Sequence, residues 1–172
     1  SSEGWFSAVY LNLRTFFEHG VLPSRHSDIY TTFSEAMIDP LPEKQQAFLA
    51  VMGLADEFTV EMARYVTGDA EAAQIVAMLT EQNAFVTRLP DGLSYRFHHM
   101  MKECAERRFH KMSEASQQLY WRRYGAWYEK EKQYIHAIAA YRKSEDYDAL
   151  LRVIRNDAGI LLASLKPTDV LE

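Results

Sequence analysis

Hydrophobic and polar positions in the first half of the chain alternate with the period of short amphipathic helices. In each segment the apolar residues recur three or four positions apart, so that they fall on one helical face. This pattern predicts helices over residues 4–19, 28–38, 42–54, 60–67 and 70–82. Residues typical of helix ends support these limits: Ser27 and Thr59 as N-caps, Pro42 in a first turn, and Gly20 and Gly68 as C-caps.

The period changes to two at residues 85–88 and again at 94–97. Such alternation is typical of half-buried strands, and the intervening Pro90 and Gly92 indicate a tight turn. Another helix should follow, opening with His98 and His99. Three short helices followed by a two-stranded wing is the order of a winged helix-turn-helix. We therefore expect a mainly α fold that contains one β-hairpin.

From Trp121 onward the pattern is helical to the end of the chain. Small and aromatic residues alternate there in the manner of a tetratricopeptide repeat: Trp121, Tyr124, Gly125 and Tyr128, then Ala137 and Tyr141. Residues 148–154 should begin to stack on this pair through Leu150, Leu151, Val153 and Ile154. Because one repeat cannot bury its own face, we expect further repeats beyond Glu172. The expected domains are 1–26, 27–112 and 113–172.

Composition narrows the functional classes. The 172 residues are 48% hydrophobic and carry a net charge of -5, which argues against a chain that coats nucleic acid or an anionic membrane. The longest apolar run, residues 47–55, is far below the roughly 20 residues of a membrane span. The single cysteine, Cys104, fits a reducing compartment. We expect a cytoplasmic fragment of a longer protein.

The fifth predicted helix is unsuited to DNA. Residues 69–82 contain three acids and neither lysine nor arginine. Because affinity for DNA depends largely on neutralising phosphates, this helix predicts no direct DNA contact.

Two interpretations of His98 and His99 stay open from the residues alone. In the first, one histidine satisfies local backbone groups at the junction of wing and helix and the other is solvated. In the second, His98 lies at a helix N-terminus, where the dipole favours a neutral imidazole and a bound anion. A metal site is disfavoured. His99, Glu103, Glu106 and His110 share one face, but the two histidines are about three turns apart and no further ligands are near. That face is better explained by ion pairs of Lys102 with Glu106 and of Glu103 with Arg107.

Candidates for catalysis are weak. Cys104 lies in mid-helix without an activating base, so we expect a half-buried thiol or one with a satisfied hydrogen bond. The basic stretch 107–111 is interpreted as an exposed helix end. No GxxxxGK[ST] or GxGxxG loop is present, and we therefore do not expect this fragment to be an enzyme.

The order of parts resembles one family, the LuxR-type large ATP-binding transcription activators typified by the maltose-regulon activator. These are signal-transduction ATPases with numerous domains, abbreviated STAND. The resemblance rests on Gly4-Trp5 with Ala8, on the block Tyr95-Arg96-Phe97-His98-His99-Met100-Met101-Lys102, on Trp127-Tyr128 and on the helix of Ala137-Ile138. The block after the wing is its strongest part. Phe6 stands where the lid motif of the family usually has proline.

The resemblance implies a place and a role for this fragment. It would hold the end of the helical lid, the winged helix and the first helices of the superhelical sensor. His98 would contact the β-phosphate of ADP bound to an upstream nucleotide-binding domain, and His99 would support the helix start. The full-length protein would be a slow ATPase switch, and ADP would hold its inactive state. Replacement of ADP by ATP, together with an inducer bound to downstream repeats, would allow self-association. The fragment alone would bind no cofactor.

A second class of function stays open. The winged helix and repeats would then form a protein-protein interaction module that has no nucleotide role.

Overall fold

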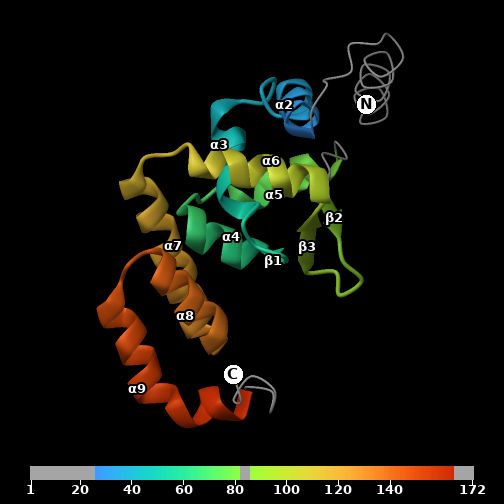
Figure 1. Cartoon of the computed structure of the whole chain (residues 1–172). Helices are drawn as coiled ribbons and strands as arrows, with labels where there is room; N and C mark the ends of the chain where they lie inside the picture. The colour runs from blue at the N-terminus through green and yellow to red at the C-terminus, as the bar shows by residue number, and fades with distance from the viewer. Residues whose placement is uncertain (1–25, 82–85, 165–172) are drawn as a thin grey trace. The chain divides into compact units, whose positions relative to one another are not determined.

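The computed structural model describes residues 26–81 and 86–164, which form two compact units that divide between Lys111 and Met112 (Figure 1). The first contains α2 (His26–Met37), α3 (Glu43–Met52), β1 (Phe58–Thr59), α4 (Val60–Thr67), α5 (Ala72–Glu81), β2 (Val86–Arg88), β3 (Ser94–Phe97) and α6 (His99–His110). The second contains α7 (Glu114–Lys130), α8 (Tyr134–Lys143) and α9 (Tyr147–Ser164). The fold is mainly helical with a small antiparallel sheet, as predicted. The helix expected over 4–19 lies outside the described residues.

Local signals placed the ends of α4 correctly. The Thr59 hydroxyl accepts a hydrogen bond from the backbone N–H of Met62 at 3.2 Å, which satisfies a donor of the first turn. Gly68 ends the helix with φ at 70°, a conformation that favours glycine. Two other predicted starts were wrong. Ser27, predicted as an N-cap, lies inside α2, and Pro42 is the N-cap of α3 and precedes its first turn.

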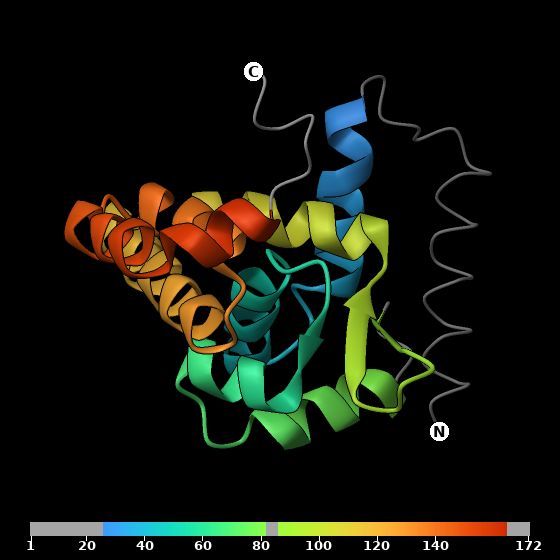
Figure 2. The same cartoon turned by 90° about the horizontal axis from the view of Figure 1, so that it is seen from below.

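The wing is the hairpin β2–β3, joined by a third strand that the sequence did not predict. The strand order is β1-β3-β2, with Val86 opposite Phe97 and Phe58 opposite Tyr95. At the turn the Ser94 hydroxyl donates a hydrogen bond to the Asp91 carboxylate at 2.6 Å. This hydrogen bond holds the pKa of the Asp91 carboxyl below its usual value. Figure 2 shows the hairpin leading directly into α6. Phe85, expected in the first strand, lies outside the described residues.

The core of the first unit lies where α3, α4, α5 and α6 meet. Its fully or almost fully buried side chains include Leu49, Met52, Val66, Val76, Leu79, Met101 and Phe109. Helices α3 and α6 come so close at Gly53 that an added Cβ would lie 2.2 Å from the Cβ of Ala105. Of the α5 residues predicted to face inward, Ile75, Val76 and Leu79 are buried and Met78 is half-buried.

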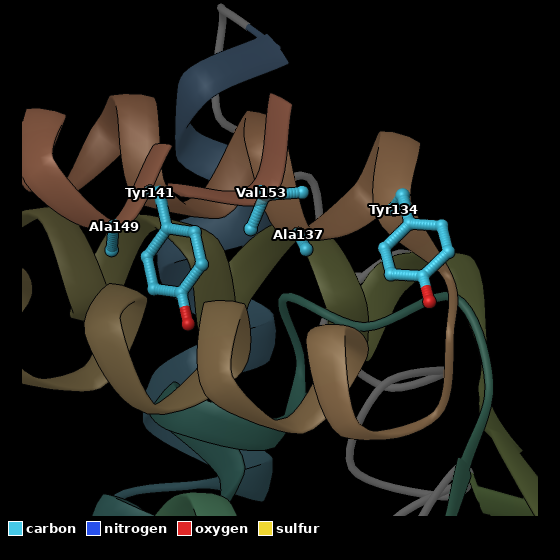
Figure 3. Close-up of a cluster of buried hydrophobic side chains, with 5 residues drawn as sticks. All are labelled: Tyr134, Ala137, Tyr141, Ala149 and Val153. Carbon is cyan, nitrogen blue, oxygen red and sulfur yellow. The ribbon is translucent and has the colours of Figure 1, made fainter. Parts of the chain in front are cut away.

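In the second unit, three helices pack around aromatic rings and small residues. One buried cluster combines residues of α8 and α9: Tyr134, Ala137 and Tyr141 from α8, and Ala149 and Val153 from α9 (Figure 3). Residues 148–154 do stack on α8, as predicted, through Val153 and the half-buried Leu150. The prediction was wrong for Leu151 and Ile154, which are 44% and 37% exposed because they lie on the other face of α9.

Candidate functional site: the junction of the wing and α6

The candidate site begins where β3 ends. Phe97, the last residue of β3, is 4% exposed, and its ring stacks on Phe58 of β1 with centroids 5.1 Å apart. Tyr95 stacks on the same ring at 5.8 Å, and Arg96 forms an ion pair with Glu57. The apolar and polar residues of this strand are thus both held by the segment around β1. These contacts fix the position of the end of β3, where the chain enters α6.

His98 is the N-cap of α6. Its backbone has φ at -58° and ψ at 147°, and its Nδ1 accepts a hydrogen bond from the backbone N–H of Met100 at 3.2 Å. Because Nδ1 accepts, the hydrogen of the neutral ring resides on Nε2, which is then a donor. The residue is exposed. An exposed imidazole donor at the positive end of a helix dipole is suited to an anion such as a phosphate.

His99 occupies the first turn of α6 and is exposed. The resemblance gave this residue the role of supporting the helix start. In the structure the capping hydrogen bond comes from His98.

The remaining residues of the block fix α6 to the fold. Met101 is fully buried. Lys102 reaches the end of α3, where its ammonium donates to the carbonyl oxygens of Gly53, Leu54 and Ala55 at 3.1, 3.2 and 3.2 Å. Sequence analysis assigned to Lys102 only a pair with Glu106, which is present at 3.8 Å. The three carbonyl partners just after α3 were missed because they lie nearly fifty positions away in the sequence.

The face of α6 that was considered for a metal carries ion pairs instead. Glu103 lies 3.6 Å from Arg107, as predicted, and His110 Nδ1 lies 2.7 Å from the backbone oxygen of Glu106. Within residues 29–81 and 86–156, whose side chains the structure describes, the histidine, cysteine and acidic side chains form no group of three or more that could hold a metal ion.

Cys104 has a hydrogen-bond partner, as expected, and it is buried rather than half-buried. It is 2% exposed, and its Sγ donates to the backbone oxygen of Tyr30 at 3.3 Å. Burial raises the pKa of this thiol to about 11, with Arg107 and Arg108 opposing the shift. A thiol with so high a pKa is a poor nucleophile at neutral pH.

The interpretation of residues 107–111 as an exposed helix end was right for His110 and Lys111, which are exposed at the end of α6, and wrong for residues 107–109. Phe109 is fully buried, and the Arg107 guanidinium lies 4.4 Å from the ring centroid of Tyr30. Arg108 donates to the Ser34 hydroxyl at 2.8 Å and forms an ion pair with Asp39. The basic residues therefore hold α2 against α6, around a hollow of about 720 Å³.

We compared the sequence with models of known protein families. Residues 34–118 match the model of the MalT winged helix domain. The chain carries a MalT winged helix domain. This confirms the resemblance to the LuxR-type large ATP-binding regulators, and a domain of this type indicates a regulator of the STAND type. A search of curated proteins with the whole chain found no match.

The match extends across the site. It begins within α2, contains the wing, His98 and all of α6, and ends within α7. The MalT winged helix domain thus includes every residue from Tyr95 to Lys102 that carried the resemblance. Within the described ranges, each helix is too short or too polar to cross a bilayer.

Proposed function

We propose that the MalT winged helix domain of this chain holds an ADP-bound inactive state of a larger regulator through His98. The observation that carries the proposal is the position of this exposed ring at the N-cap of α6, where Nδ1 accepts from the backbone N–H of Met100, so that the hydrogen of the neutral ring is on Nε2. A phosphate oxygen of ADP held by an upstream nucleotide-binding domain of the same chain would accept from Nε2. Helix α6 adds the favourable end of its dipole.

The role is that of a switch. ADP that touches both the upstream domain and His98 binds the closed state more tightly, and so it shifts the population toward that state. Inducer bound by downstream tetratricopeptide-like repeats, with ATP in place of ADP, releases the winged helix and permits self-association in the cytoplasm. In this proposal His98 contributes to binding, and no residue of the chain performs catalysis.

The test distinguishes loss of the imidazole donor from loss of the helix N-cap. His98→Asp in the full-length protein keeps an N-cap acceptor of a favoured type and adds a charge that suits the helix dipole. The same charge repels a diphosphate. We expect unchanged or higher thermal stability, together with weaker ADP binding and higher inducer-independent transcription. Loss of a hydrogen bond to a charged group corresponds to about a 10- to 100-fold lower affinity.

His99→Ala is the matched control, since this neighbouring ring is exposed and does not cap the helix. We expect it to leave ADP affinity and basal transcription at the wild-type level. Wild-type ADP affinity in both His98→Asp and His98→Ala would contradict the proposal and favour the alternative, an interaction module that has no nucleotide role.

A further inference from the structure

Lys102 is the last residue of the block after the wing, and the proposed function gives it no task. Its ammonium group lies at the C-terminal end of α3, within 3.1 to 3.2 Å of the carbonyl oxygens of Gly53, Leu54 and Ala55. An ammonium group has three N–H donors, so three carbonyl acceptors satisfy it completely. The side chain is 25% exposed, with its head group directed at the main chain.

The physical basis of this contact is the charge at the end of a helix. Gly53 is the C-cap of α3, and Leu54 and Ala55 follow it directly, so the three carbonyl oxygens lie at the partially negative end of this helix, which a cation complements. The carboxylates of Asp56 and Glu106, at 3.4 and 3.8 Å from Nζ, add to the attraction. Because the three acceptors are backbone atoms of another element, they define where the first turns of α6 lie.

We infer that Lys102 is the positioning residue for His98. The two residues are one helical turn apart, and the backbone N–H of Lys102 donates to the backbone oxygen of His98 at 2.9 Å. On the other side of His98, Phe97 stacks on Phe58. Both anchors rest on the same short connection, which runs from Gly53 at the end of α3 to Phe58 in β1. This connection sets the place of the imidazole from both sides.

The first test concerns position alone and needs no nucleotide. Lys102→Met is compared with Arg108→Met, which removes a cation with partners on another segment at the far end of the same helix. Amide hydrogen exchange is measured by NMR on the 172-residue chain. We expect Lys102→Met to lower protection of the Met100 and Lys102 amides about tenfold more than that of Phe109, with the opposite pattern for Arg108→Met.

An equal loss of protection along the whole of α6 in both variants would overturn the inference, since it would indicate general destabilisation. If Lys102→Met does not fold, Lys102→Arg takes its place. Its planar guanidinium keeps the charge but cannot donate to three converging carbonyls as an ammonium does. We expect the same local pattern from it, and a wild-type pattern in this variant would also overturn the inference.

The second test rests on the proposed function and uses the full-length protein. If Lys102 acts through His98, Lys102→Met weakens ADP binding about tenfold in the wild-type background and has no further effect in a His98→Ala background. Additive losses in the double variant would overturn the positioning role. If His98→Ala alone leaves ADP affinity unchanged, the proposed function fails, while the exchange experiment still decides the role of Lys102.

Discussion

Gly125 of α7 lies directly against the ring of Tyr141 of α8. A Cβ added to Gly125 would lie 2.6 Å from both Cδ1 and Cε1 of that ring, well inside contact distance. The ring cannot easily move aside, because it is 3% exposed and its hydroxyl donates to the Glu129 carboxylate at 3.2 Å. The Arg152 guanidinium donates to the same carboxylate at 2.7 Å. All three helices of the second unit therefore meet at this ring.

We expect Gly125→Ala to lower the free energy of unfolding of the second unit. Overpacking typically costs about 1–3 kcal/mol, and alanine regains about 1 kcal/mol through its higher helix propensity. The expected net loss is therefore up to about 2 kcal/mol, measured by urea unfolding followed by tryptophan fluorescence. Gly125→Ala in a Tyr141→Leu background should cost clearly less, because the clashing ring atoms are gone. Equal losses in both backgrounds would contradict this explanation.

The sequence predicted those features whose causes are local. The hairpin, the N-cap Thr59 and the C-cap Gly68 depend on residues within a few positions of one another, and all three are present. The sequence also placed Gly125 and Tyr141 in one repeat-like pattern of small and aromatic residues, and the structure brings these two residues together.

The features that were missed depend on partners far along the chain. Lys102 contacts carbonyls 47 to 49 positions away, and Arg108 contacts side chains 62 to 74 positions away. Periodicity within one helix cannot reveal such partners. Strand β1 has two residues, too few to show alternation, and exists because β3 pairs with it. The candidate site combines both cases: His98 was visible in the sequence, and the support beneath it was not.

We expect Thr59→Ala to destabilise the first unit by about 1 kcal/mol, because the backbone N–H of Met62 loses the acceptor that caps α4. Thr59→Ser keeps a hydroxyl at the same position and should stay within a few tenths of a kcal/mol of the wild type. Thermal unfolding of the two variants measures the difference. Equal destabilisation by Ala and Ser would show that the threonine methyl group, and not the cap, matters.

Alkaline pH should destabilise the second unit through Tyr141. Burial first, and the nearby Glu129 second, raise the pKa of this phenol from 10.0 to about 12. The unfolded state therefore loses its proton before the folded state does, so the stabilising contribution is intact below pH 10 and is lost as the pH rises toward 12. We expect the unfolding free energy of Tyr141→Phe to fall less steeply than that of the wild type across this range. Parallel pH profiles for the two proteins would contradict the assignment.

Cys104 should resist thiol reagents in the folded chain. Burial raises its pKa from 9.0 to about 11, so the thiolate fraction at pH 8 is about 100-fold lower than in the unfolded state. Limited access adds to this protection, since the residue is 2% exposed. We expect an aromatic disulfide reagent to react at least about 100-fold faster after unfolding in urea. Rapid labelling of the native chain would show that α2 opens readily from α6.

The exposed face of α5 predicts the outcome of a DNA-binding experiment. This helix has exposed Ala73, Ala77 and Glu81, and Lys44 beside it is paired with Asp69 and Glu71 at 3.3 and 2.6 Å. With no cation on α5 to displace counterions, we expect the chain to show no salt-sensitive binding to duplex DNA in fluorescence anisotropy. The double substitution Ala73→Lys and Ala77→Lys tests the cause, because it places two cations on that face and should raise duplex binding at low salt. Salt-sensitive binding by the wild-type chain would contradict the prediction, and loss of that binding in Arg88→Ala would assign the contact to the wing.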